Sequence, residues 1–229
     1  RRGRCGWGGA PVGAQGRRIR RRASRRLAMT GIGPERTDSP RRDPAGVGRS
    51  GGFALEDLRT KVGIVRDEFV DRHGYDPVEH VESWTAAAAP SAGLAGIRIT
   101  CGVNADVYRL RDLLAVRRDV RVVEARDYIR RAGPDGYRGL CLVVEVPVAR
   151  SDGVRAVRVE VQIRTGIMES WEFVATRLRT GFADHLPPEM LDELGAAAER
   201  ARDLDSRIGA LHRRMEDRIA GSQQEAPPA

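Results

Sequence analysis

Two segments in the second half of the chain carry the pattern of β-strands, and they constrain the fold more than any other feature. Residues 157–164 read VRVEVQIR, with Val or Ile at every second position. Residues 140–148 read LCLVVEVPV and precede them across a linker that contains Asp152-Gly153. A period of two is typical of a strand with one face on a core, and Asp-Gly favours a tight turn. The two segments therefore predict a β-hairpin.

Other strands and helices are predicted on both sides of this hairpin. Apolar side chains at steps of three and four indicate helices, whereas alternation indicates strands. Asn104 is expected to cap the helix that it begins, and Gly74 to end the first helix. The predicted strands are 95–100, 120–125, 140–148 and 157–164, and the predicted helices are 53–73, 104–119, 166–179 and 188–219. This order predicts an α/β fold, an α+β sandwich whose mixed, mostly antiparallel sheet of about four to five strands is flanked by helices.

One folded domain is predicted, between two segments without regular structure. Residues 1–52 are rich in Gly, Pro, Ser and Arg and are expected to be disordered, as is a tail at 221–229. The folded domain is accordingly placed at 53–220. No run of eighteen apolar residues is present, so no membrane-spanning segment is predicted and a cytoplasmic location is the expectation.

The net charge of the chain is concentrated near its start. Ten arginines and no acid lie in residues 1–28, so the formal charge of +8 falls to −2 for the rest of the chain. A basic arm that binds phosphates and a leader that ends before Met29 are both open interpretations of this segment. Because the folded part is not basic, RNA binding is not expected of it.

The first and last predicted helices carry similar apolar stripes. The spacing is close to that of a heptad repeat in both. Three interpretations are open: the two helices pair with each other, they form the seam of a homo-oligomer, or each packs on its own sheet. The stripe of the last helix consists of Leu191, Leu194, Ala198, Ala201, Leu204, Ile208, Leu211 and Met215.

Polar side chains suited to a nucleotide gather at strand ends and adjoining turns. Arginine binds phosphate in bidentate fashion, an aromatic ring after a turn stacks on a base, and a carboxylate holds Mg²⁺ or orients a hydroxyl. Each of these residues has a purely structural explanation when taken singly, whereas the set matches the needs of a nucleotide site. The set is Arg98, Asp127, Tyr137, Arg138, Glu160, Gln162 and Arg164.

Four motifs in order give the chain a resemblance to the RelA/SpoT family. They are AGIRI (95–99), ARDYI (125–129), PDGYRGL (134–140) and VEVQIRT (159–165). Within the family the chain is most similar to the small, single-domain alarmone synthetases, which have a nucleotidyltransferase-like fold. The resemblance implies transfer of a pyrophosphate group from ATP to the 3′-hydroxyl of GTP or GDP, which gives AMP and pppGpp or ppGpp, the alarmones of the stringent response.

The resemblance also implies a role for each site residue. Glu160 would be the catalytic carboxylate and the ligand of Mg²⁺, the expected cofactor. Tyr137, which its position after the turn pair Asp135-Gly136 is expected to expose, would stack on guanine, and Arg98 would lie against the adenine of ATP. The residues implied on the GTP or GDP side are Tyr137, Arg138, Gln162 and Arg164. A homo-oligomer that assembles through the terminal helices is the expected partner state.

Several positions depart from the family pattern, mostly on the ATP side. Gly93 stands where the family has a metal-binding Asp, and residues 81–94 contain no basic side chain for the triphosphate. The other departures are Gly133 for Lys, Asp135 for Asn, Gly139 for Ser, Cys141 for His, and Ala175-Thr176 for Glu-His. Two functions therefore follow as alternatives: a synthetase of reduced activity, or an inactive relative that binds guanine nucleotide or regulates an active paralogue.

Overall fold

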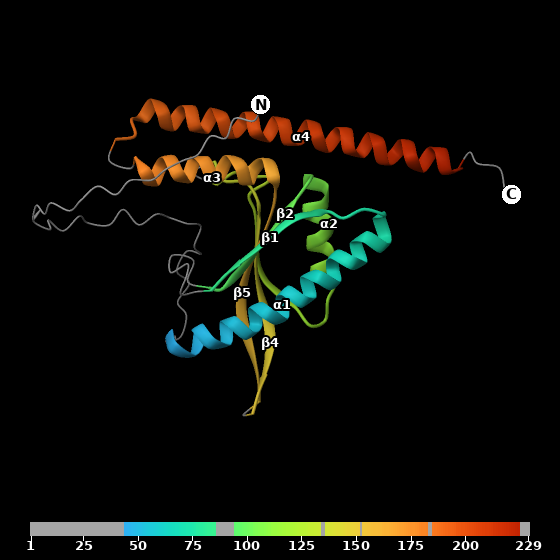
Figure 1. The fold of residues 1–229 in the computed structure, drawn as a ribbon, viewed down its shortest axis with the longest axis vertical. Coiled ribbons are helices and arrows are strands. Elements are labelled where there is room, and N and C mark those ends of the chain that lie inside the picture. The colour runs from blue at the N-terminus through green and yellow to red at the C-terminus, as the bar shows by residue number, and fades with distance from the viewer. Residues whose placement is uncertain (1–43, 86–93, 134–135, 152, 183–184, 225–229) are drawn as a thin grey trace, which may run out of the picture. The chain divides into compact units, whose positions relative to one another are not determined.

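The computed structural model describes residues 44–85, 94–133, 136–151, 153–182 and 185–224. In this part of the chain a five-stranded sheet is flanked by four helices (Figure 1). The strands are β1 (Val78–Trp84), β2 (Gly96–Cys101), β3 (Arg121–Asp127), β4 (Leu140–Arg150) and β5 (Gly153–Thr165). The helices are α1 (Pro44–His73), α2 (Asn104–Ala115), α3 (Gly166–Gly181) and α4 (Pro188–Gln224).

The sheet has the order β1-β2-β5-β4-β3 and is mixed. Strands β2 and β5 run parallel, while the other neighbouring pairs run antiparallel. The predicted fold class is therefore confirmed. The predicted hairpin is β4–β5, in which Gly153 adopts a φ of 127°, a conformation that glycine reaches without a steric penalty.

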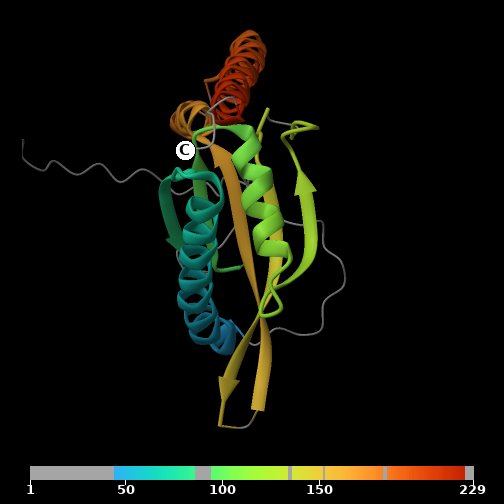
Figure 2. The same ribbon diagram turned by 90° about the vertical axis from the view of Figure 1, so that its right-hand side faces the viewer.

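Helices α1 and α2 cover one face of the sheet (Figure 2). The apolar stripe of α1 is buried there, with Leu58 and Phe69 fully inaccessible to solvent. On β5 the matching face consists of Val159, Val161 and Ile163, each also fully buried. The core thus lies between these two helices and one side of the sheet, which leaves the other side for polar residues.

Helices α3 and α4 lie side by side at one end of the sheet (Figures 1 and 2). Helix α3 follows β5 directly, and Thr165 caps it by accepting a hydrogen bond from the backbone N–H of Met168. No helix in the described part of the chain is long and apolar enough to cross a bilayer.

Three details differ from the sequence predictions. Strand β1 was missed, because at this edge of the sheet Val78 alone is buried and the alternation is weak. Helix α1 begins at Pro44, nine residues before the predicted start, and the small residue Gly51 lies close to Ala95. Asn104 does not cap α2: Val103 holds that position, and Asn104 instead donates to Asp205 on α4 over 2.9 Å. The predicted leader up to residue 43 and the last five residues lie outside the described residues.

Candidate active site

Glu160 and Gln162 lie on the face of β5 that points away from α1 and α2. Successive side chains of a strand alternate between faces, so the burial of Val161 in the core turns both polar neighbours to the other side. Glu160 is nevertheless only 7 % exposed. At Glu160 the polar side of the alternating segment 157–164 is therefore buried and does not face bulk water.

Strand pairing arranges the polar face in two rows that cross the sheet. In one row Glu160 lies between Gly96 on β2 and Val143 on β4, and Val143 lies opposite Glu124 on β3. The second row is Arg98 (β2), Gln162 (β5), Cys141 (β4) and Arg126 (β3). Directly opposed residues interact through their side chains, so the pairing register itself assembles the site.

A line of hydrogen bonds joins three of the predicted site residues. Arg98 donates to Oε1 of Gln162 from both Nε and Nη2, at 3.1 Å each. Gln162 in turn donates from Nε2 to Oε1 of Glu160 at 2.9 Å. The carboxamide therefore holds the guanidinium and the carboxylate at fixed positions on the same face.

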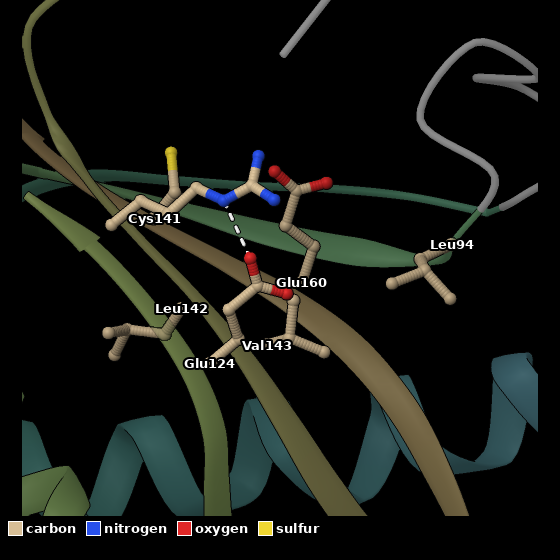
Figure 3. A pocket seen from close by; sticks show the side chains of 7 residues that line it. Leu94, Glu124, Cys141, Leu142, Val143 and Glu160 are labelled. Atoms are coloured by element: carbon tan, nitrogen blue, oxygen red, sulfur yellow. Dashed lines mark hydrogen bonds and ion pairs between the residues drawn. The ribbon is translucent and has the colours of Figure 1, made fainter. Parts of the chain in front are cut away.

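The carboxylate of Glu160 lines a small pocket on this face (Figure 3). The cavity volume of this pocket is about 20 Å³, room for about one water molecule and far less than a nucleotide needs, so a nucleotide would lie over it and not inside it. In Figure 3 Glu124 and Glu160 point to the same side of the sheet, and Arg126 donates from Nε to Glu124 at 2.6 Å. The lining residues are Leu94, Glu124, Arg126, Cys141, Leu142, Val143 and Glu160.

Burial raises the pKa of Glu160 above its usual value, because an ionised carboxylate is poorly solvated there. The hydrogen bond from Gln162 and the positive charges of Arg98 and Arg126 act in the opposite direction, while Glu124 adds to the rise. Glu160 is therefore a proton acceptor stronger than an exposed glutamate.

Arg98 is also fixed on its other side. Its guanidinium carbon lies 5.5 Å from the centre of the Trp84 ring on β1, and Nη1 is 3.2 Å from a carboxylate oxygen of Glu82. The Trp84 ring in turn lies over Gly96, where a Cβ atom would come within 2.1 Å of it. One face of the Arg98 guanidinium is thus already used for stacking.

Tyr137 does not lie in the exposed position that the sequence predicted. Its side chain is 2 % exposed, with Oη 3.5 Å from Sγ of Cys141 and the ring edge-on to Tyr128 at 5.6 Å. The expectation of an exposed ring is therefore wrong for this structure. The ring fits inward because neighbouring Gly139 leaves the required space.

The two arginines predicted to bind the phosphates of GTP or GDP are also buried and already paired. Arg138 is 8 % exposed; its Nη2 donates to Glu199 of α4 at 2.8 Å and its Nη1 to the carbonyl of Ile129 at 2.9 Å. Arg164 is 4 % exposed and pairs with Glu169, at 3.0 Å, and with Glu172, both on α3. The structure does not bring either arginine into the pocket of Glu160.

Sequence reasoning missed two residues of the pocket, Glu124 and Arg126. Both lie on β3 with one residue between them, so they share a face of that strand. The alternation of charged residues within VEARD was the available signal. A bulge between Val122 and Glu124 shifts the register of this edge strand, and such a shift could not be placed from the sequence.

The donor set of the pocket fits a magnesium ion only in part. Among the described residues no group of three or more His, Cys, Asp or Glu side chains is placed to hold a metal. Mg²⁺ is often bound by one or two carboxylates together with substrate phosphates, and Glu160 meets the first requirement. Gly93, where the family has its other carboxylate, lies outside the described residues.

Comparison with known proteins gives a consistent family assignment. Residues 90–180 match the model of a "Region found in RelA / SpoT proteins". The chain is 30 % identical over 184 residues to GTP pyrophosphokinase YwaC of Bacillus subtilis, covering 72 % of this chain and 88 % of that protein. It is 28 % identical over 184 residues to GTP pyrophosphokinase YjbM of the same organism, covering 72 % and 86 %.

Solved structures agree with this assignment. The crystal structure of small alarmone synthetase 2 from Bacillus subtilis superposes with a TM-score of 0.64 at 31 % identity, covering 72 % of this chain and 96 % of that one. Small alarmone synthetase 1 from the same organism, solved with its product pppGpp, gives a TM-score of 0.62 at 28 % identity, covering 71 % and 92 %. The chain therefore belongs to the RelA/SpoT family, in which its relatives are small alarmone synthetases.

Proposed function

We propose that this chain is a GTP pyrophosphokinase that makes alarmones in the stringent response. It transfers the β- and γ-phosphates of ATP as one unit to the 3′-hydroxyl of GTP or GDP. The observation that carries this proposal is the hydrogen-bonded line Arg98–Gln162–Glu160 on the wall of a pocket. The relatives named for this activity, and the one solved with pppGpp, support it.

In the proposed reaction the 3′-oxygen of the acceptor attacks the β-phosphorus of ATP. The bond between that phosphorus and the oxygen shared with the α-phosphate breaks, and AMP leaves. Glu160 accepts the proton of the 3′-hydroxyl, a role that its raised pKa suits. Gln162 keeps the carboxylate oriented through its 2.9 Å hydrogen bond. Phosphoryl transfer of this kind depends chiefly on positioning and on neutralisation of charge.

Positive charge for the phosphates comes in this proposal from Arg126, and the adenine of ATP rests on Arg98. Arg126 lines the pocket and is within electrostatic reach of Glu160. The guanidinium of Arg98 already has Trp84 against it, so a purine ring would complete a stack of three planar groups. The proposed acceptor side still consists of Tyr137, Arg138 and Arg164. These side chains must leave their present contacts within the protein before they can bind GTP or GDP.

Mg²⁺ is the proposed cofactor, and Glu160 is its proposed protein ligand. The ion supplies neutralisation of the negative charge on the transferred phosphates. Glu160 would hold the ion together with the phosphates of ATP.

We further propose that the activity is lower than that of relatives with the full motif. Residues 81–94 contain no Lys or Arg, and Gly93 and Gly133 provide no side chain for metal or phosphate. Burial raises the pKa of the Cys141 thiol to about 12, so it stays neutral at pH 7 and brings no charge to the position of the family His. Each missing contact in such a site removes a few kcal/mol of transition-state stabilisation.

The alternative function is a guanine-nucleotide-binding or regulatory subunit without catalysis. The buried Tyr137 and the pairing of Arg138 and Arg164 with carboxylates favour it, because they leave the acceptor side occupied by the protein itself. The two functions differ in whether the protein forms product in a reaction that depends on Glu160.

Three further proposals concern the state of the protein in the cell. The folded domain is placed at residues 53–220 with an additional helical start from 44. A homo-oligomer forms through the last of the two terminal helices, α4, because this helix exposes a row of apolar side chains whereas α1 buries its own. The cytoplasm is the proposed location, since the proposed substrates ATP and GTP are found there.

The deciding experiment is a product assay with ATP, GTP or GDP, and Mg²⁺. Wild type should form AMP together with pppGpp or ppGpp, and Glu160→Gln should lower the rate by about 100-fold or more, as expected for loss of a general base. Glu56→Gln, at an exposed site on α1, is the matched control and should keep the wild-type rate. Equal rates for Glu160→Gln and wild type would overturn the assigned role. Nucleotide binding without any product in wild type would select the regulatory alternative.

A further inference from the structure

The glycine that follows the Tyr-Arg pair has an unusually close neighbour. A Cβ atom added at Gly139 would lie 2.6 Å from Oη and 3.0 Å from Cζ of Tyr137. Cβ atoms essentially never come closer than 3.0 Å to another heavy atom, so the two groups cannot coexist in these positions. The hydroxyl end of Tyr137 therefore occupies the space of a side chain that residue 139 lacks.

The backbone conformation at Gly139 does not itself require glycine. The glycines with positive φ in the described part of the chain are Gly74, Gly136 and Gly153, and Gly139 is not among them. An alanine at 139 would thus meet no backbone strain, and its whole effect would come from the contact with the Tyr137 ring. Substitution here is a specific probe of where that ring lies.

The backbone around Tyr137 is held independently of its ring. The N–H of Gly133 donates to the carbonyl of Tyr137 at 2.9 Å, and the N–H of Tyr128 donates to the carbonyl of Gly139 at 2.9 Å. These bonds remain when the side chain rotates about χ1. A steric conflict at residue 139 is therefore relieved by movement of the ring and not by movement of the turn.

The space around the buried ring is filled on the sides described. Tyr128 lies edge-on at 5.6 Å, Sγ of Cys141 is 3.5 Å from Oη, and Cβ of Arg164 is close to the position of the missing Cβ. Cys141 lies opposite Gln162 and also lines the pocket of Glu160, so the ring lies beside the pocket, on the same side of the sheet.

We propose that Gly139 is a positioning residue that lets Tyr137 pack against Cys141 beside the pocket, and that a side chain at 139 drives the ring out of this position so that a purine can stack on it. The consequence for nucleotide affinity rests on the proposed function, whereas the packed position of the ring rests on the structure alone. The Tyr137 ring is then buried in most molecules, and Gly139 determines the fraction of the protein in which the ring is accessible to guanine nucleotide.

The test compares Gly139→Ala with wild type by nitration of tyrosine with tetranitromethane, mapped by peptide mass spectrometry. Nitration requires an accessible phenolate, and burial raises the pKa of Tyr137 well above its usual value, so the wild-type ring should react more slowly than half-buried Tyr128. In Gly139→Ala the Tyr137 ring should be nitrated at least as fast as Tyr128. Gly63→Ala on α1, where an added Cβ meets nothing within 4 Å, is the control and should leave the pattern unchanged.

Calorimetric titration then measures GTP and ATP binding to the same proteins. Gly139→Ala should bind GTP about ten-fold more tightly than wild type, in the range expected for stacking of one base on one ring. Tyr137→Ala in the Gly139→Ala background should remove that gain. A folded Gly139→Ala protein whose Tyr137 stays as unreactive as in wild type would overturn the inference. Faster nitration without any change in GTP binding would support the role of Gly139 in the position of the ring, but it would refute the stacking of GTP on Tyr137.

A double-mutant cycle covers the case in which Gly139→Ala does not fold. If the Tyr137 ring is what the new Cβ meets, then Tyr137→Ala must restore stability to Gly139→Ala, so the two changes are strongly non-additive in thermal unfolding. Additive losses would show that another contact is responsible, and the inference would be wrong.

Discussion

Helices α1 and α4 carry similar apolar patterns but are held to the sheet domain in different ways. Helix α1 buries its stripe, with Leu58 and Phe69 fully inaccessible. Helix α4 buries Ala198 but leaves most of its large apolar side chains in solvent, among them Leu204 (51 % exposed), Ile208 (37 %), Leu211 (57 %), Met215 (57 %) and Ile219 (53 %). Of the three interpretations of the stripes, packing on the sheet is right for α1, and an oligomer seam remains the proposal for α4.

Polar contacts hold α4 where apolar contacts hold α1. Glu199 pairs with Arg138 at 2.8 Å. Asp205 accepts from Thr165 and from Asn104 at 2.9 Å each. Glu216 pairs with Arg109 at 2.8 Å. The comparison teaches that a periodic apolar stripe shows that a helix is amphipathic, but not which side of it faces the rest of the chain.

The largest effect is expected in α1. Leu58→Ala should lower the free energy of unfolding by about 3 kcal/mol, because it opens a cavity in a closed core. Leu204→Ala removes the same atoms from α4 and should change stability by less than about 0.5 kcal/mol in the isolated chain. Urea unfolding of both at low concentration makes the comparison, and equal losses would show that α4 is packed like α1.

Assembly should depend on α4 and not on the stripe of α1. The pair Leu204→Glu with Leu211→Glu should shift the mass in light scattering from the proposed oligomer to the monomer, because charge in an apolar interface is strongly unfavourable. Ser206→Glu with Arg213→Glu is the control on the other flank of the same helix, where both side chains are exposed. A monomeric wild type at micromolar concentration would contradict the prediction.

The buried carboxylate of α4 should make its attachment sensitive to pH. Burial raises the pKa of Asp205, although Thr165 and Asn104 donate to it. A carboxyl whose pKa is raised on folding stabilises the fold below its unfolded pKa, and this contribution is lost as pH rises through the folded value. Asp205→Asn should therefore match or exceed the wild-type melting temperature at pH 7, with the difference closing toward about pH 4. Asp192→Asn, exposed on the same helix, should show no such trend.

The smallest expected effect comes from the contact between α4 and the Tyr-Arg turn. Glu199→Gln should cost about 0.5–1 kcal/mol of stability, because Glu199 is half exposed and Arg138 keeps its hydrogen bond to the carbonyl of Ile129. It also frees Arg138 for phosphate, so GTP should bind about two- to five-fold more tightly, the equivalent of a similar energy. Glu193→Gln, at an exposed position earlier on the same helix, is the control in the same calorimetric titration. Weaker GTP binding in Glu199→Gln would mean that the contact shapes the site instead of occupying it.

Local pattern predicted most of the fold. The β4–β5 hairpin, α1 and α3 follow from periodicity, capping and turn residues, all of which act within a few positions of the chain. Strand β1 escaped because an edge strand buries little, and its residues Val78–Trp84 are mostly polar. Asn104 was misread as a cap because its true partner, Asp205, is 101 residues away.

The candidate site was predictable where it depends on one strand, and not where it depends on packing between elements. Glu160 and Gln162 lie on a common face because they alternate with valines, and the sequence of residues 157–164 alone is enough to predict this. Burial of Tyr137 depends on the empty space at Gly139, which no local pattern reports. Arg126 reaches the pocket only through the pairing of β3 with β4.

The order of the strands has a consequence for how the chain is made. Strand β5 is the last strand in the sequence and lies between β2 and β4, so the β1–β2 and β3–β4 pairs join only through it. Two-stranded pieces are marginally stable on their own, and contacts such as that between Arg98 and Gln162, 64 residues apart, form slowly. A chain still leaving the ribosome therefore has no closed sheet until residues 153–165 have emerged. The strand that completes the sheet also brings Glu160, so the proposed catalytic carboxylate arrives in the same step that makes the domain stable.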